Sequence, residues 1–145
     1  MSEKKLQLAL ALASYAHEGQ VDKVGQPYIT HPLAVSEMVE GEDRKIVALL
    51  HDVLEDTFVT EATLRNLFGD EITDAVCAVT RNENESYEEF IVRAGKNELA
   101  RAVKLADLTH NMDVSRLPEI TERDLRRLEK YRKAYQYLVS ENKSL

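Results

Sequence analysis

Apolar residues recur along most of the chain at spacings of three and four, without sustained alternation of apolar and polar residues. The first spacing is typical of amphipathic helices, whereas strict alternation is typical of half-buried strands. Glycine and proline, which interrupt both patterns, number only five and three. The pattern therefore predicts an all-α protein, a helical bundle with short turns.

Helix start and stop signals indicate where the helices lie. Proline costs no hydrogen bond at a first helical position, so a helix is expected from His31-Pro32. Ser86 and Glu89 form a capping box. The expected helices span residues 3–17, 31–41, 42–57, 60–68, 70–80, 86–95, 97–112 and 121 onward. In the last one, an apolar stripe is expected to pack in the core: Leu125, Leu128, Tyr131, Tyr135 and Leu138.

The segment LLHDVLEDT, residues 49–57, combines this periodicity with chemically active side chains. With successive residues placed about 100° apart around a helix, an apolar arc forms. It consists of Ile46, Val47, Leu49, Leu50, Val53 and Leu54. His51, Asp52, Glu55 and Asp56 lie on the opposite arc. We therefore expect one continuous helix that packs through one face and gathers an imidazole and three carboxylates on the other.

The composition of the chain limits the classes of protein to which it can belong. A chain of 145 residues with 43% hydrophobic content is expected to form one domain over residues 1–145. Its net charge of -7 disfavours nucleic acid and anionic membrane surfaces as partners. No apolar stretch is long enough to span a bilayer. The single cysteine, Cys77, excludes an internal disulfide and is compatible with a cytoplasmic location, which we expect.

Two further segments offer ligands for a divalent metal ion. His31 lies in YITHP and Asp107 in LADLTHNM. With His51 and Asp52 they would form a mixed nitrogen and oxygen set, compatible with Mn, Fe, Zn, Co or Ni. Taken one at a time, each residue has another interpretation: His31 as a helix cap, the others as a solvated helix face.

The helix expected over residues 97–112 adds a polar cluster. Lys104, Asp107 and Asn111 lie on one side of it, while small and apolar residues lie on the other. An acid beside a lysine and one turn from an amide suits a site for a hydrated metal ion and a phosphate. This cluster favours chemistry on a phosphorylated substrate.

The motifs YITHP, LLHDVLEDT and LADLTHNM, in this order, resemble those of the HD superfamily of metal-dependent phosphohydrolases. Within it they resemble the hydrolase domain of the RelA/SpoT alarmone enzymes and their small stand-alone relatives. The resemblance covers nearly the whole chain and implies an all-helical HD-type fold with one divalent metal ion, commonly Mn2+. The ligands it implies are His31, His51, Asp52 and Asp107.

The resemblance also implies an activity. In that family the acids matching Glu55 and Asp56 orient or deprotonate the attacking water, and the amide matching Asn111 helps to position the substrate. A bound metal acidifies water and neutralises phosphate oxygens, and a nearby carboxylate can accept the proton. The implied substrate is a small phosphorylated nucleotide, with the 3′-pyrophosphate of guanosine 3′,5′-bis(diphosphate) as the leading candidate.

The chain departs from the family pattern at two positions. Alarmone hydrolases usually have Arg-Lys in the loop before the first motif, where this chain has Asp22 and Lys23. The arginine of the family's LADRLHNM is Leu108 here. Thr80 and Arg81, by contrast, resemble the Val-Thr-Lys turn of the long alarmone enzymes. Arg81 keeps a cation at the position of the lysine. The candidate substrate contacts are Lys23, Arg81, Lys104 and Asn111.

Two alternatives to this activity stay open. One is a phosphatase or pyrophosphatase for another nucleotide, to which Asp22 and Leu108 would be adaptations. The other is a metal-containing module that binds a nucleotide without hydrolysing it. His17 and His110 match no metal position and are interpreted either as structural residues or as residues that support the metal ligands. The oligomeric state is open as well, a homo-oligomer being one option.

Overall fold

The chain folds as a helical bundle in the computed structural model, which describes residues 2–115 and 117–143. Over this range it contains helices, turns and one isolated bridge between Val21 and Pro27, which confirms the all-α prediction. The helices are α1 (Ser2–Ala16), α2 (Thr30–Glu37), α3 (Glu42–Leu50), α4 (Val53–Asp56), α5 (Glu61–Phe68), α6 (Asp70–Ala78), α7 (Tyr87–Gly95), α8 (Glu98–Met112) and α9 (Glu122–Lys143). None of these described helices is long and apolar enough to cross a membrane.

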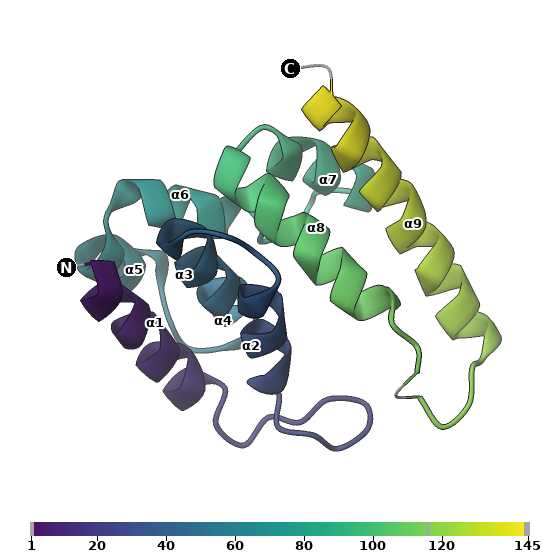
Figure 1. Ribbon diagram of the computed structural model, residues 1–145, viewed down its shortest axis with the longest axis horizontal. Helices are drawn as coiled ribbons and strands as arrows, with labels where there is room; N and C mark the ends of the chain where they lie inside the picture. The colour runs from purple at the N-terminus through teal and green to yellow at the C-terminus, as the bar shows by residue number, and fades with distance from the viewer. Residues whose placement is uncertain (1, 116, 144–145) are drawn as a thin grey trace.

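Helix α3 is the centre of the packing. Helices α1, α2, α6 and α8 all contact it, and its residues Ile46, Val47, Leu49 and Leu50 are buried. Figure 1 shows α1 to α6 in one half of the molecule and α7 and α9 in the other, with α8 between them. Helix α8 therefore joins the two halves.

A second, smaller core lies between α7, α8 and α9. Phe90, Leu108 and Leu138 meet there, and Leu108 and Leu138 are completely buried. This location explains the leucine in LADLTHNM, because the side chain of Leu108 faces a core and makes no polar contact. Burying a leucine contributes about 2 kcal/mol.

The prediction of one continuous helix through LLHDVLEDT is wrong. Helix α3 ends at Leu50 and α4 begins at Val53, with Asp52 at φ -107° and ψ 0° between them. The Nδ1 atom of His51 donates to the carbonyl of Ala48 at 2.6 Å, and that carbonyl would accept the amide of Asp52 in an unbroken helix. The side chain therefore competes with the helical ladder and turns the chain at His51 and Asp52.

The end of α2 also differs from the expectation. Helix α2 ends at Glu37, earlier than Gly41, and Gly41 itself adopts φ 89° just before α3. This φ favours glycine, which has no Cβ to clash with the backbone. The chain therefore uses the residues between α2 and α3 as a turn.

The apolar stripe of α9 is only partly in the core. Leu138 is buried, whereas Leu125 is 56% and Tyr135 36% exposed. The exposed fraction is high because α9 packs mainly against α7 and α8, which cover one side of it. Leu128 and Tyr131 of the same stripe line a pocket, and Tyr131 also packs against the second core.

The capping box predicted at Ser86 and Glu89 is confirmed, and side chains cap two further helices. Ser86 and Glu89 form the reciprocal capping box at α7, and the side chain of Asn97 accepts the amide of Ala100 at α8. At α9, Thr121 and Asp124 cap each other's backbone amides in the same way. These bonds satisfy helix N–H groups that have no partner within the helix.

Candidate metal centre and its pocket

Two histidines and two aspartates from three segments meet beside α3. His31 comes from the first turn of α2, His51 and Asp52 from the break between α3 and α4, and Asp107 from α8. The Nε2 atom of His31 lies 2.8 Å from Asp107 Oδ1 and 4.0 Å from Asp52 Oδ2. The Nε2 atom of His51 lies 3.2 Å from Asp52 Oδ2 and 3.4 Å from Asp107 Oδ1.

These separations match the spacing of ligand atoms around one metal ion. With bonds of about 2.1 Å, neighbouring ligand atoms lie about 3.0 to 3.4 Å apart and opposite ones about 4.2 Å apart. The ligand atoms of His31, His51 and Asp52 all lie within 4.8 Å of one another. His51 Nε2 is buried without a hydrogen-bond partner in the described chain. A metal ion would satisfy this nitrogen, so the donor set fits one.

The turn at His51 and Asp52 makes this convergence achievable. Adjacent residues of a regular helix point about 100° apart, so they can reach one ion only from diverging directions. The break after Leu50 removes that constraint and brings both donor atoms to within 3.2 Å of each other. The helix break, which the sequence did not predict, therefore shapes the cluster.

Each carboxylate is held by further hydrogen bonds. The hydroxyl of Tyr28 donates to Asp52 Oδ2 at 2.5 Å. Lys104 Nζ donates to Asp107 Oδ2 at 2.9 Å, and Asn111 Nδ2 to Asp107 Oδ1 at 3.1 Å. The side chains of Lys104 and Asn111, expected from the sequence to touch a substrate, are thus engaged with Asp107. Contacts of this kind fix the orientation of metal-binding groups.

The histidines are oriented in the same way. The Nδ1 atom of His31 lies 2.8 Å from Nδ1 of His110, while Nδ1 of His51 donates to Ala48. In each ring the other nitrogen, Nε2, is left pointing at the carboxylates. His110, which matches no metal position in the sequence, contacts His31 directly.

Electrostatics keep the two aspartates ionised. Burial opposes the charge of Asp107, but the Lys104 ammonium, the hydrogen bond with His31 and the nearby ring of His51 hold its pKa well below the usual range. Burial likewise opposes the charge of Asp52, but His51 lowers its pKa to about 2. Both groups are therefore carboxylates at neutral pH, the form that binds metal ions.

Glu55 and Asp56 lie beside this cluster on α4, and both are exposed. Partial burial and then the charge of Asp56 raise the pKa of Glu55, while Lys104 and Arg81 act in the opposite direction. Burial and the charge of Asp52 raise the pKa of Asp56. A raised pKa makes a carboxylate a better proton acceptor, and these two are open to water.

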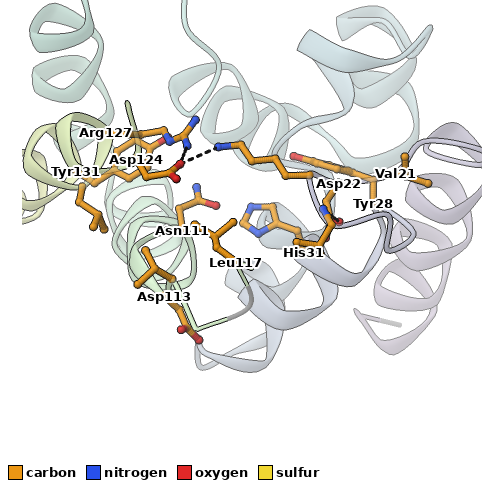
Figure 2. A pocket seen from close by; sticks show the side chains of 14 residues that line it. Val21, Asp22, Tyr28, His31, Asn111, Asp113, Leu117, Asp124, Arg127 and Tyr131 are labelled. Carbon is orange, nitrogen blue, oxygen red and sulfur yellow. Dashed lines mark hydrogen bonds and ion pairs between the residues drawn. The ribbon is translucent and has the colours of Figure 1, made fainter. Parts of the chain in front are cut away.

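A pocket of about 380 Å³ opens against the cluster. Figure 2 shows His31 and Asn111 on its wall, between the loop that follows α1 and the first turns of α9. Its lining combines apolar side chains with two tyrosines and a few charges: Val21, Asp22, Lys23, Val24, Tyr28, His31, Asn111, Asp113, Val114, Leu117, Asp124, Arg127, Leu128 and Tyr131. A cavity of this size accommodates a small organic ligand.

The loop that carries Asp22 and Lys23 forms one edge of the pocket. The Asp22 carboxylate accepts the amides of Val24 and Gln26, both at 2.9 Å, and so stabilises the turn. Lys23 Nζ lies 4.0 Å from Asp124 Oδ1 on α9, as Figure 2 shows. Lys23 thus lines the pocket, and its role as a substrate contact stays a prediction.

Pocket residues on α9 were missed by the sequence analysis. Arg127 pairs with Asp124, and Tyr131 lies one turn further along α9 on the same wall. The sequence offered one signal for these residues, a cation and an aromatic residue four positions apart. The same spacing is common on ordinary surface helices, so it did not indicate a pocket. Only the packing of α9 against α8 brings these residues to the pocket.

Arg81, a candidate substrate contact from the sequence, lies in the loop before α7. Its Nε donates to the carbonyl of Glu85 at 2.9 Å, and its Cζ lies 6.0 Å from the centre of the Tyr87 ring. Its charge acts on Glu55. Arg81 does not line the pocket described above.

Fold and site together define an all-helical protein with a histidine–aspartate donor cluster. The chain belongs to the HD domain family, whose sequence model matches residues 9–133. The cluster is built from the histidine and aspartate positions of the three motifs.

Similar proteins carry this domain within longer chains. SpoT of Escherichia coli strain K12, a bifunctional (p)ppGpp synthase/hydrolase, is 36% identical over 124 residues, covering 75% of this chain and 18% of that protein. A guanosine-3′,5′-bis(diphosphate) 3′-pyrophosphohydrolase of Haemophilus influenzae is 38% identical over 116 residues, covering 70% and 17%. The chain thus spans less than a fifth of the length of these relatives.

A solved structure matches in fold. It is described as a metazoan ortholog of SpoT that hydrolyzes ppGpp, and it superposes with a TM-score of 0.80 at 27% identity. The match covers 92% of this chain and 85% of that one. The HD-type bundle therefore accounts for nearly the whole chain.

Proposed function

We propose that the protein is a metal-dependent phosphohydrolase that releases diphosphate from the 3′ position of guanosine 3′,5′-bis(diphosphate). The observation that carries this proposal is the convergence of His31, His51, Asp52 and Asp107 around an unpartnered buried nitrogen. The names of the similar proteins support the choice of substrate. The single cysteine and the net charge of -7 support action in the cytoplasm.

The four donors would hold one divalent ion, for which we propose Mn2+ because it is the ion that the family resemblance implies. The mixed imidazole and carboxylate set is compatible with this ion. When bound, such an ion supplies positive charge to a phosphate and makes water more acidic. Glu55 and Asp56 would accept the proton of the attacking water, since they lie open to solvent next to the cluster. Tyr28 and Lys104 would hold Asp52 and Asp107 in place.

The pocket beside His31 would receive the nucleoside. Leu117, Leu128 and Tyr131 offer apolar and aromatic surface for a base, and Lys23 and Arg127 offer charge at the edge. Because Asn111 lines the pocket and also contacts Asp107, it would lie between the nucleoside and the reacting phosphate. This supports its predicted role in positioning the substrate.

A second candidate is the hydrolysis of a nucleotide with fewer phosphates. The pocket that holds Lys23 and Arg127 also contains the carboxylates of Asp22, Asp113 and Asp124. A lining with more acids than bases repels a highly charged anion. This balance favours a less charged substrate than guanosine 3′,5′-bis(diphosphate).

One experiment tests both candidates. The metal content of the purified protein is measured, and a panel of nucleotides is then screened for phosphate and diphosphate release with that metal. Diphosphate release from guanosine 3′,5′-bis(diphosphate), lost with a chelator and restored by Mn2+, is the expected result. Release only from another nucleotide would favour the second candidate, and tight binding without turnover of any nucleotide would contradict both.

The change Tyr28→Phe tests the support of the metal ligands. It removes the hydroxyl that donates to Asp52 and keeps the ring against His17 and His31. We expect the Kd for Mn2+ to rise by about 10- to 100-fold, since loss of such a contact weakens metal affinity by this factor. Titration with Mn2+ measures the effect, and Tyr15→Phe, on the exposed side of α1, is the matched control. An unchanged Kd would show that the hydrogen bond does not support the site.

A further inference from the structure

Helix α4, which carries Glu55 and Asp56, is a single turn that depends on support from outside. It spans only Val53–Asp56, and one turn of helix is not stable through its own hydrogen bonds. The side chain of Val53 is buried, but no other described helix packs extensively against α4. The position of the two acids therefore depends on what holds the ends of this turn.

The loop between α1 and α2 contacts both ends of α4. At the start of α4, the hydroxyl of Tyr28 donates to Asp52 Oδ2 at 2.5 Å. At its end, Gln20 Nε2 donates to the main-chain carbonyl of Asp56 at 2.9 Å. Carbonyls in the last turn of a helix have no partner within the helix, and the chain is already extended at Thr57. Gln20 thus supplies a hydrogen bond that α4 cannot make itself.

The two contacts are joined within the loop. The amide of Tyr28 donates to the carbonyl of Gln20 at 2.8 Å, and the amide of Gln20 donates to the carbonyl of His17 at 3.0 Å. The isolated bridge of Val21 and Pro27 lies directly between these contacts. Because main-chain bonds order the loop, its two side chains act on α4 together. Gln20 and Tyr28 thus form a clamp on α4.

The side chain of His17 orients that of Gln20. Its Nδ1 atom lies 2.9 Å from Gln20 Oε1. Because the carbonyl of Asp56 accepts a hydrogen bond, the nitrogen of the Gln20 amide must face it, which leaves Oε1 turned toward His17. The reverse orientation of the amide would bring two acceptors together at Asp56. His17 Nδ1 therefore carries the proton and donates to Gln20.

The ring of His17 is kept at a cost in stability. His17 is 2% exposed, its ring centre lies 5.0 Å from that of Tyr28, and its Nε2 atom is buried without a hydrogen-bond partner among the described residues. With the proton on Nδ1, Nε2 is an acceptor, and a buried acceptor without a donor is unfavourable. An apolar side chain would avoid this cost. The imidazole therefore indicates a task beyond packing.

We propose that Gln20, oriented by His17, is a positioning residue that fixes α4 so that Glu55 and Asp56 face the attacking water. The inference rests on the proposed function, in which these two acids accept the proton of that water. It adds two residues that lie outside the three sequence motifs. Tyr28 holds a proposed metal ligand, whereas Gln20 bonds only to the end of α4 that carries the acids. Loss of the Gln20 contact should therefore affect turnover and leave metal binding unchanged.

The change Gln20→Glu replaces one donor with an acceptor and keeps the size of the side chain. A carboxylate oxygen would face the carbonyl of Asp56 and repel it. We expect kcat for the nucleotide that the protein hydrolyses to fall by about 10- to 100-fold, the effect of a misplaced reacting group. KM, the Kd for Mn2+ and the Tm should not change. Gln26→Glu, at an exposed position of the same loop, adds the same charge and should leave kcat unchanged.

Hydrogen exchange in α4 is a readout that needs no substrate. The amides of Asp56 and Thr57 donate to carbonyls four residues earlier at 3.0 and 3.2 Å, so they are protected while α4 is formed. We expect NMR to show that these two amides exchange about tenfold faster in the Gln20 variant, since it loses one hydrogen bond and gains a repulsion. Amides of α3 should keep their rates, and the control variant should exchange like the unmodified protein.

Two changes at His17 test the second link of this chain of contacts. The amide of asparagine reaches the place of Nδ1 and can donate to Gln20, whereas leucine only fills the buried space. We expect His17→Leu to raise exchange in α4 and to lower kcat by about 2- to 10-fold each, the effect of one hydrogen bond. His17→Asn should stay close to the unmodified protein. Equal losses in both variants would overturn the role of His17.

The outcomes distinguish this inference from the proposed function. Unchanged kcat or unchanged exchange in Gln20→Glu would overturn the positioning role and leave the proposed function intact. A weaker affinity for Mn2+ in parallel with kcat would also overturn it, because Gln20 would then act through the metal ligands. If the protein hydrolyses a nucleotide other than guanosine 3′,5′-bis(diphosphate), with kcat and exchange dependent on Gln20, the proposed substrate is wrong and the positioning role stands. Absence of turnover with every nucleotide would overturn both.

Discussion

Replacing His51 or Asp52 with alanine is expected to lower kcat/KM for diphosphate release by at least about a thousandfold, which is about 4 kcal/mol of transition-state stabilisation. Each change removes one donor from a cluster in which nitrogen and oxygen atoms lie 2.8 to 4.0 Å apart. His51→Ala also removes the bond to the Ala48 carbonyl that turns the chain between α3 and α4. The donors that stay behind, Asp107 among them, would bind a metal ion weakly and in altered geometry.

Metal content and turnover have to be measured together in these variants. We expect the bound metal, determined by elemental analysis after dialysis, to fall in parallel with activity. Thermal unfolding followed by circular dichroism separates loss of metal from loss of fold. Asp43→Ala, at the exposed start of α3, is the control for removing an acid from this helix. A His51→Ala protein that kept both its metal and its turnover would contradict the assigned donor set.

Local signals in the sequence predicted most of the helix boundaries. The capping pair of Ser86 and Glu89 and the cap at Asn97 depend only on residues three apart, so they can be recognised without knowledge of the fold. The helix break at His51 depends on a side chain that bonds to the carbonyl of Ala48, three residues earlier. Helical periodicity does not record such competition, because the apolar positions on both sides of the break keep their spacing.

The candidate site could be predicted only where motifs marked it. The three motifs named His31 and Asp107, which lie 76 positions apart and whose side chains meet at 2.8 Å. Their role as metal ligands stays a prediction. The engagement of Lys104 with Asp107 and the approach of Lys130 to Tyr87 are consequences of how α7, α8 and α9 pack. A single sequence contains no local signal for contacts of this kind.

Changing Glu55 to glutamine is expected to lower kcat by about 10²- to 10⁴-fold, the range for loss of a general base. The amide keeps the size of the side chain but cannot accept a proton. Because Glu55 lies outside the donor cluster of His31, His51 and Asp52, the variant should keep its metal ion. Retained metal with lost turnover would separate the role of Glu55 from that of the ligands.

The pH profile gives this prediction a second readout. Burial and the charge of Asp56 raise the pKa of Glu55, so this carboxylate gains its proton at a higher pH than an exposed glutamate does. Activity that needs the ionised form should therefore fall earlier as the pH is lowered, and the acid limb of kcat should flatten in Glu55→Gln. Glu71→Gln, on the exposed face of α6, should keep the unmodified profile. If Glu55→Gln lost activity and metal together, Glu55 would belong to the metal site, and Asp56 would be left as the candidate base.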